Sequence, residues 1–321
     1  MGLLSKSIVG LEMDSCEIRA VELKGTVKKP EIIAWGKIPL PAGCVKDGRA
    51  ANPIQLADYL KRLWESSRFK SKDVILGINN QDVIIRFASF PKVPEDKVRN
   101  MIMFQAQDFI PVPLEDLQVD FVVVGEKKTE EGEFLNVILV GARKRMLQDY
   151  VEALTSARLT VQEIDSGMMA VGRSALVSVN RNAYAVVGYN HDIANIMIFN
   201  KGTLAMARSI PFSQSSLWNG RRSDPDNMQN GAVIAEILIG ELRSSIGYYR
   251  MQGQDDIEGI YLIGIPHIKD IIDRFREAGY EVSILQPYSD IPVKGKESTP
   301  LSFKAADYAA AISLGLRGLE G

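Results

Sequence analysis

The chain has 321 residues, of which 46% are hydrophobic and 24% charged, and its formal net charge is -2. This length is compatible with two domains, and the composition is that of a globular protein with a sizeable core. The near-zero charge excludes an overall electrostatic footprint for nucleic acid. The two cysteines and two histidines are too few and too scattered along the sequence to predict a disulfide framework or a zinc site.

The N-terminal segment predicts strands joined by tight turns. Alternating apolar residues over 7–23 indicate two strands hinged at Asp14-Ser15-Cys16, and a third strand is expected at 32–38. Apolar residues at helical spacing predict an amphipathic helix over 56–67, and the run 74–78 has the pattern of a buried strand. This order indicates an α/β layer.

A small subdomain is expected to interrupt that layer. Acidic residues open its helix, and a Pro-Val-Pro sequence closes it. A run rich in branched apolar residues then predicts a central strand that returns the chain to the α/β layer. The expected elements are a strand at 84–90, a helix at 94–110, strands at 117–124 and 135–142, and a helix at 145–159.

The opening pattern of strand, polar turn, strand and third strand reappears near residue 180 and ends near residue 212. Two such openings half a chain apart predict a duplicated α/β domain. Residues 213–230 are polar and predict an exposed loop. The remaining expected elements are helices at 232–252, 268–277 and 305–316 and strands at 260–264 and 282–285.

Several longer motifs carry a resemblance to a known family. Residues 9–23 contain a glycine, a polar turn and a final AVEL, residues 104–115 read FQAQDFIPVPLE, and residues 243–250 read RSSIGYYR. The sequences YVEAL at 150–154 and GLRGL at 315–319 continue the series. Collinear over nearly the whole chain, these motifs resemble the actin-like superfamily and, within it, the PilM family of type IV pilus assembly proteins.

The resemblance implies an α/β, actin-like, two-lobed fold with duplicated RNase-H-like cores and a small subdomain inserted into the first lobe. The first lobe would comprise residues 1–83, 135–170 and 304–321, and the inserted subdomain residues 84–134. The second lobe would comprise residues 171–303, with a small helical subdomain at about 213–257. The Ala-rich segment 305–316 lacks a basic face for anionic lipid, so we expect it to dock on the first lobe.

An actin-like site holds ATP and magnesium between turns whose backbone N–H groups approach the phosphates, where glycine allows the closest contact. Here Asp14 replaces the usual glycine of the first turn, and the turn around Asn190 and His191 lacks both the carboxylate and the glycine. The third turn keeps Gly264 but contains Pro266, which has no N–H. The nucleotide positions implied by the resemblance are Glu12, Asp14, Ser15, Cys16, Asn190 and Gly264.

Two interpretations of Glu12 and Asp14 stay open: solvated turn residues, or ligands that retain a magnesium or nucleotide role. We find no poised nucleophile or acid–base pair in the sequence. We therefore assign no catalytic residue, no metal site and no confident cofactor, and we do not expect an efficient ATPase.

The family role implies that the chain binds the cytoplasmic N-terminal tail of PilN, in a groove between the first lobe and its subdomain. It would act indirectly with PilO and the pilus motor, and a homo-oligomer is compatible with the sequence. The candidate partner-binding residues are Phe87, Phe90, Met101, Phe104, Phe109 and Ile110, for which a role in the subdomain core is the alternative.

Three functional hypotheses follow from the sequence. The first is a cytoplasmic scaffold, recruited to the inner face of the cytoplasmic membrane through a bitopic partner. The second is an ATP-binding switch of pilus or type II secretion assembly. The third is a sugar or acetate kinase of the same superfold, which is the weakest because we identify neither positioned phosphates nor a base. No run of about 18 apolar residues predicts a membrane span or a signal peptide, so we expect the chain to stay in the cytoplasm.

Overall fold

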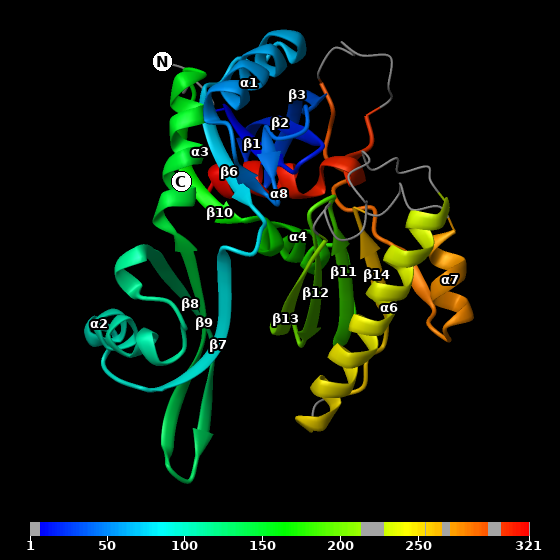
Figure 1. Ribbon diagram of the computed structural model, residues 1–321. Helices are drawn as coiled ribbons and strands as arrows, with labels where there is room; N and C mark the ends of the chain where they lie inside the picture. The colour runs from blue at the N-terminus through cyan, green and yellow to red at the C-terminus, as the bar shows by residue number, and fades with distance from the viewer. Residues whose placement is uncertain (1–6, 213–227, 254, 265–269, 295–302, 321) are drawn as a thin grey trace. The chain divides into compact units, whose positions relative to one another are not determined.

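The structure, a computed structural model, describes residues 7–212, 228–253, 255–264, 270–294 and 303–320 (Figure 1). The chain forms two compact units. Unit 1 comprises Met1–Asn80 and Val151–Gly321, and unit 2 comprises Gln81–Tyr150. Unit 1 contains two five-stranded sheets, and unit 2 contains a three-stranded one.

The first sheet of unit 1 has the strand order β10-β6-β1-β2-β3. Strand β2 runs antiparallel to both β1 and β3, whereas β6 pairs with β1 in parallel and β10 pairs with β6 in parallel. The hairpin predicted around Asp14 is confirmed, whereas β10 was not predicted. The strands are β1 (Ser7–Met13), β2 (Glu17–Thr26), β3 (Lys29–Pro39), β6 (Asp73–Ile78) and β10 (Thr160–Ser166), with a separate two-stranded ribbon of β4 (Val45–Lys46) and β5 (Arg49–Ala50).

Helix α1 (Pro53–Ser67) shows why the predicted amphipathic segment becomes a helix. The side chain of Asn52 caps it by accepting a hydrogen bond from the Gln55 amide, and Pro53 occupies the first turn. Its leucines and Trp64 are buried, and Arg68 ends it in the left-handed conformation. The predicted helix is confirmed and begins three residues earlier than the hydrophobic pattern does.

The second sheet of unit 1 repeats the topology of the first, with the order β13-β12-β11-β14-β15. Again, three antiparallel strands are followed by two parallel ones. This common order confirms the duplication that the sequence predicted. The strands are β11 (Ala183–Tyr189), β12 (Ile193–Asn200), β13 (Thr203–Pro211), β14 (Ile260–Ile263) and β15 (Val282–Ile284).

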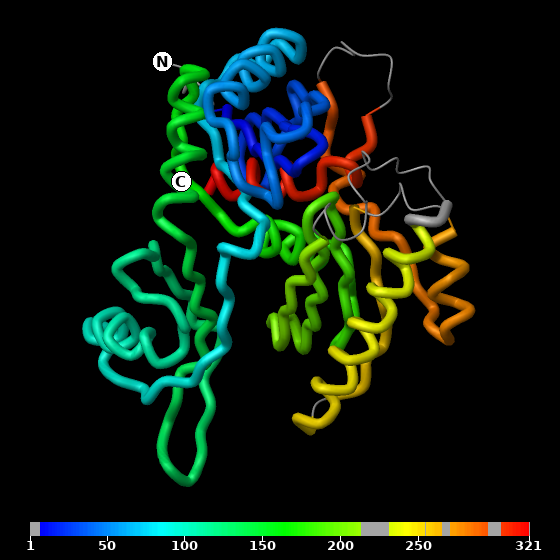
Figure 2. Tube along the Cα trace, viewed as in Figure 1, coloured from blue at the N-terminus to red at the C-terminus, as the bar shows by residue number. Residues whose placement is uncertain are grey.

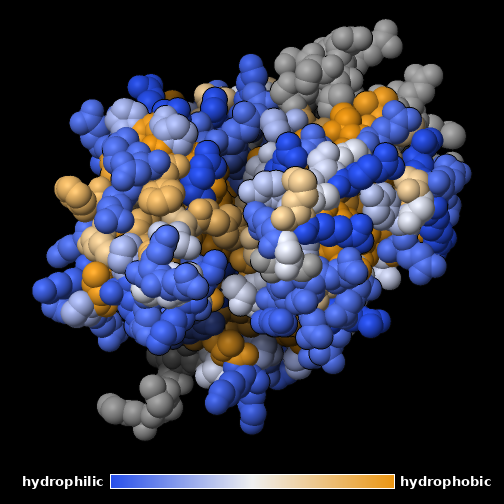
Figure 3. Space-filling view, turned by 90° about the horizontal axis from the view of Figure 1, so that it is seen from below, coloured by the Kyte–Doolittle hydropathy of each residue, from blue (hydrophilic) through white to orange (hydrophobic). Residues whose placement is uncertain are grey.

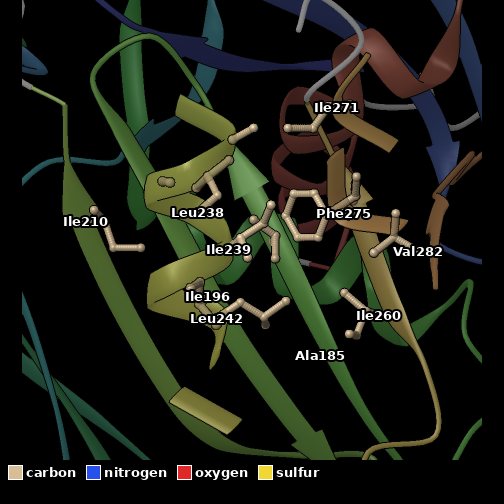
Figure 4. Close-up of a cluster of buried hydrophobic side chains, with 14 of the residues drawn as sticks. Ala185, Ile196, Ile210, Leu238, Ile239, Leu242, Ile260, Ile271, Phe275 and Val282 are labelled. Atoms are coloured by element: carbon tan, nitrogen blue, oxygen red, sulfur yellow. The ribbon is translucent and has the colours of Figure 1, made fainter. Parts of the chain in front are cut away.

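Helices α6 (Met228–Met251) and α7 (Ile271–Glu277) cover one face of this second sheet. Figure 4 shows Leu238, Ile239 and Leu242 of α6 directed toward side chains of the sheet, with Phe275 of α7 beside them. Because α6 shares one buried cluster with the strands, its described part belongs to the core of the second lobe. The small helical subdomain within the second lobe, expected at about 213–257, stays a prediction, and its residues 213–227 lie outside the described ranges.

The C-terminal helix α8 (Ala309–Gly318) packs against β1, β2 and β6 of the first sheet, following the short helix η3 (Ala305–Tyr308). In Figure 2 this red segment lies against the blue N-terminal strands. The approach depends on glycine, since a Cβ on Gly10 would lie 1.8 Å from the Ala311 carbonyl oxygen. The predicted docking of this helix on the first lobe is therefore confirmed. Helix α4 (Gly167–Leu176), which was not predicted, packs beside it.

Unit 2 is a three-stranded antiparallel sheet in the order β7-β9-β8 with α2 packed on one face. The strand predicted at 135–142 lies in the centre of this sheet, hydrogen-bonded to both neighbours. It was expected to return the chain to the first lobe, so the subdomain extends past the predicted boundary at residue 134. The elements are β7 (Val83–Pro91), α2 (Glu95–Gln105), η1 (Ala106–Asp108), η2 (Leu114–Asp116), β8 (Leu117–Thr129), β9 (Gly132–Arg143) and α3 (Lys144–Ser156), which continues into unit 1.

Candidate functional site

Two turns of unit 1 contact each other. The first turn, Asp14-Ser15-Cys16, joins β1 to β2, and the second turn, Asn190-His191-Asp192, joins β11 to β12. Nδ1 of His191 lies 2.9 Å from Oδ2 of Asp14, and the Ser15 amide donates to Oδ2 of Asp192 over 2.8 Å. The Ser15 hydroxyl also donates to Oδ1 of Asp192. The hairpins that open the two sheets are thus joined through their turns.

Asp14 is held inside its own turn. Its Oδ1 accepts hydrogen bonds from the Cys16 amide at 2.8 Å and from the Glu17 amide at 3.0 Å. Its other oxygen pairs with His191 and, at 3.1 Å, with Arg19. With 1% of its surface exposed, Asp14 is a buried, fully bonded carboxylate. The interpretation of Asp14 as a solvated turn residue is therefore wrong.

Arg19 on β2 forms ion pairs with three carboxylates of this hairpin. Its guanidinium donates to Glu17 at 2.6 Å, to Asp14 at 3.1 Å and to Glu12 at 3.3 Å. Lys37 reaches Glu17 from β3 at 3.6 Å. The sequence did not single out Arg19. Its position on β2, two residues beyond Glu17, was the signal that it would lie on the same face of the hairpin.

Burial and charge move the pKa values of these groups in opposite directions. Burial alone would raise the pKa of Asp14, but the hydrogen bond to His191, the charge of Arg19 and the Cys16 amide hold it well below its usual range. Burial raises the pKa of Glu12, and Arg19 offsets this only in part. Burial would lower the pKa of His191, yet its contact with Asp14 raises it. Asp14 is consequently a permanent anion at neutral pH.

The second turn has its own internal acceptor. Oδ1 of Asn190 accepts hydrogen bonds from the amides of Asp192 at 3.0 Å and Ile193 at 2.8 Å. Burial and the charge of Asp14 raise the pKa of Asp192 to about 6, against the hydrogen bonds from Ser15. Side chains of the chain itself therefore already accept hydrogen bonds from five amides in or next to the two turns, those of Ser15, Cys16, Glu17, Asp192 and Ile193.

A small cavity lies next to the two turns, bordered by Glu12, Arg19, Asn190 and Gly264. Its volume is about 40 Å³. Gly264 has a φ of +71°, and a Cβ there would lie 2.6 Å from the carbonyl oxygen of Tyr189. Glycine is therefore required at this position. The rest of the third turn, residues 265–269 with Pro266, lies outside the described ranges.

Of the predicted nucleotide positions, Glu12, Asp14, Ser15 and Cys16 come together in one hairpin, and Asn190 and Gly264 border the same cavity as Glu12. The sequence did not predict that His191 and Asp192 would contact the first turn. The cysteines and histidines are scattered along the sequence and predicted no metal site. In the structure, however, the ligand atoms of Asp14, Cys16 and His191 lie within 4.8 Å of one another.

The partner-binding candidates divide by exposure. Phe90 and Ile110, at 0% and 1% exposure, lie in two buried clusters of unit 2, and Met101 and Phe109 are partly buried against the cluster that contains Phe90. Phe104 on α2 is 86% exposed, and Phe87 on β7 is 38% exposed. Ala88 and Phe90 join the cluster under α2, so by strand alternation Phe87 faces the opposite side of the sheet.

The family of this chain follows from a match to a protein-family model. The family model described as type IV pilus assembly protein PilM matches residues 10–213. The chain belongs to the PilM family.

The solved structure of a PilM-PilN type IV pilus biogenesis complex contains a chain with a TM-score of 0.80 and 22% identity to this one, covering 98% of this chain and 99% of that chain. The ethanolamine utilization protein EutJ from Carboxydothermus hydrogenoformans has a TM-score of 0.52 and 12% identity, covering 98% of this chain and 90% of that chain.

These likenesses, together with the two sheets of identical topology, show an actin-like α/β fold. The matched segment includes the first turn, unit 2 and the second turn. Among the helices that the structure describes, none is long and apolar enough to cross a membrane.

Proposed function

We propose that this PilM-family chain is a partner-binding protein of the type IV pilus machinery, which binds the cytoplasmic tail of a PilN-like membrane protein through unit 2 and does not hydrolyse ATP. Membership of the family and the likeness to a chain from a PilM-PilN complex support the partner. Binding of such a tail would recruit the protein to the inner face of the membrane. Contacts with PilO and the motor would then be indirect.

The observation that carries the proposal is the exposure of Phe104. A phenylalanine with 86% of its surface exposed leaves a large apolar side chain in water. Met101, one helical turn earlier on α2, lies on the same side and is only partly buried. Aromatic residues and methionine are enriched where proteins bind partners. Figure 3 shows apolar side chains gathered among polar ones on the left of that view, where α2 and the strands of unit 2 lie.

The first and second turns support the absence of ATP hydrolysis. In an actin-like site the turns offer free N–H groups to phosphate, but here the amides of Ser15, Cys16 and Glu17 donate to carboxylates of the chain. By the family resemblance, Asp14 takes the place of the glycine that approaches the phosphates. Two negative charges about 4 Å apart repel by about 4 kcal/mol at an effective dielectric constant of about 20. The cavity of about 40 Å³ is also far below the roughly 300 Å³ at which small-molecule pockets begin.

The test is direct binding of a fluorescent peptide that carries the N-terminal cytoplasmic segment of a PilN protein, with and without ATP. We expect saturable binding that ATP does not change. Phe104→Ala should weaken binding by about 10-fold or more, as truncation of an interface aromatic does. Phe87→Ala, the same change on the opposite face of the sheet, should leave the affinity within about 2-fold.

No binding under either condition would overturn the proposed partner. Unchanged affinity of Phe104→Ala would place the contact elsewhere than on the exposed face of α2. Binding that requires ATP would favour the switch hypothesis over the scaffold.

A further inference from the structure

The contact between the two turns assembles three metal-binding side chains from both hairpins. The carboxylate of Asp14, the thiol of Cys16 and the imidazole of His191 each offer one ligand atom, and all three atoms lie within 4.8 Å of one another. We propose that these residues bind a divalent late transition-metal ion, with Zn²⁺ as the preferred ion.

The distances suit a tetrahedral ion. At Zn–O and Zn–N distances near 2.0 Å and a Zn–S distance near 2.3 Å, neighbouring ligand atoms lie about 3.3–3.6 Å apart. Nδ1 of His191 and Oδ2 of Asp14, at 2.9 Å, are already close to that spacing. The remaining pairs, which all lie within 4.8 Å, need to close by about 1.5 Å at most when the ion binds.

The surrounding hydrogen bonds orient the ligands before any ion arrives. Oδ1 of Asp14 is occupied by the amides of Cys16 and Glu17, so Oδ2 is the oxygen that faces His191. Ser15, between the two ligands of the first turn, bonds to Asp192, the neighbour of His191. Such outer contacts fix ligand orientation and increase metal affinity. They also hold the two turns at the spacing that the ion needs.

The charge around the cluster favours a cation. Four carboxylates lie near only two basic side chains, which leaves an excess of negative charge. A divalent ion bound beside a neutral imidazole compensates this negative charge. Arg19 contacts Asp14 but also pairs with Glu12 and Glu17, which retain it when the ion takes Oδ2 of Asp14. The groups are Glu12, Asp14, Glu17 and Asp192 against Arg19 and Lys37.

The donor atoms select the class of ion. A thiolate, an imidazole and one carboxylate oxygen match the borderline and soft preferences of Zn²⁺ and Co²⁺. Mg²⁺ prefers six oxygen ligands in an octahedron and is therefore a poor match. Binding releases the proton of the Cys16 thiol, because the thiolate is the ligand. Three protein ligands leave the fourth position of the tetrahedron to water.

The experiment uses the full chain after chelation, titrated with Co²⁺ and then competed with Zn²⁺. We expect one ion per chain and a near-ultraviolet thiolate-to-cobalt charge-transfer band that Zn²⁺ abolishes and millimolar Mg²⁺ does not. The chain has two cysteines, so matched alanine variants assign the band. Cys16→Ala should lose it, and Cys44→Ala, at a buried thiol remote in sequence from both turns, should retain it. His191→Gln should weaken binding by about 10–100-fold or more.

A second measurement uses the natural chain, so its result does not depend on whether the variants fold. Zn²⁺ should slow alkylation of Cys16, located by mass spectrometry, while Mg²⁺ leaves its rate unchanged. Absence of the charge-transfer band, its persistence in Cys16→Ala, or equal alkylation of Cys16 with and without Zn²⁺ would each overturn the proposed site. None of these results depends on the binding of a PilN tail, so the two proposals fail separately.

Discussion

Nδ1 of His191 lies 2.9 Å from Oδ2 of Asp14, and the two residues are 177 positions apart in the chain. The contact joins the turn of the first hairpin to the corresponding turn of its structural repeat. Because Asp14 is 1% exposed and also bonded to its own turn, we expect it to contribute strongly to stability.

Asp14→Ala should lower the free energy of unfolding by about 3 kcal/mol, measured by urea denaturation in the presence of a chelator. The change leaves the Cys16 and Glu17 amides without their acceptor and Arg19 with one carboxylate fewer. Asp14→Asn should cost less, because the amide oxygen still accepts from the turn.

The matched control is Asp58→Ala, which removes an exposed carboxylate paired with Lys61 at 3.2 Å. Exposed pairs of this kind contribute little, so the change should stay within about 0.5 kcal/mol. Equal effects at positions 14 and 58 would show that the contact between the turns does not stabilise the fold.

Millimolar ATP with Mg²⁺ should leave the thermal midpoint unchanged after trace metals have been removed. A ligand present at 100 times its dissociation constant stabilises the folded state by about 2.7 kcal/mol, which a thermal shift assay detects. The internal acceptors of Asp14 and Asn190 occupy the amides that phosphate needs. A reproducible upward shift with ATP would revive the switch hypothesis.

Substitution by alanine should destabilise the chain strongly at Phe90 and hardly at all at Phe104. Phe90→Ala empties a fully buried position in unit 2 and should cost about 3–5 kcal/mol of that unit's stability. Phe104→Ala, at a side chain that is 86% exposed, should change stability by less than about 0.5 kcal/mol. Hydrogen exchange localised to residues 81–150 reports both effects. Strong destabilisation by Phe104→Ala would argue that this residue is structural.

Gly10→Ala should displace the C-terminal helix. The added Cβ would lie 1.8 Å from the Ala311 oxygen and 2.6 Å from the Gly315 nitrogen, and both are backbone atoms that cannot rotate away. We expect a loss of about 3 kcal/mol or more in the free energy of unfolding. Gly240→Ala is the control, because no atom lies within 4 Å of the added carbon on α6. That change should stabilise the chain by about 0.5–1 kcal/mol.

Burial of the Cys44 thiol should make the folded chain less stable at high pH. Burial raises the pKa of its thiol to about 11 from an ordinary value of 9.0. Below pH 9 the thiol is neutral in both states, and between about pH 9 and 11 only the unfolded chain ionises, which favours unfolding. The free energy of unfolding should therefore fall more steeply in this window for the natural chain than for Cys44→Ala. Parallel urea titrations compare the two slopes, and identical slopes would contradict the predicted burial effect.

The sequence by itself determined the local elements and their repetition. Alternation of apolar residues, helical spacing and turn chemistry are properties of neighbouring residues, so β1, β2, α1 and the second hairpin were predicted close to their observed bounds. The duplicated opening near residue 180 also predicted a second sheet of the same topology. Strand β10 was not predicted, because most of its side chains are exposed or half-buried and show no clear alternation.

Only the tertiary structure decided which elements pair and what the turns contact. The apolar run of β9 identified a central strand, but hydrogen bonding to β7 and β8 placed it in unit 2 rather than in the first sheet. The solvated interpretation of Asp14 was wrong because its partner His191 comes from the other repeat. Local patterns carry no information on such pairs, since two residues so distant in sequence meet only when both sheets have formed. The same contact brings His191 to Asp14 and Cys16 and so forms the proposed metal site.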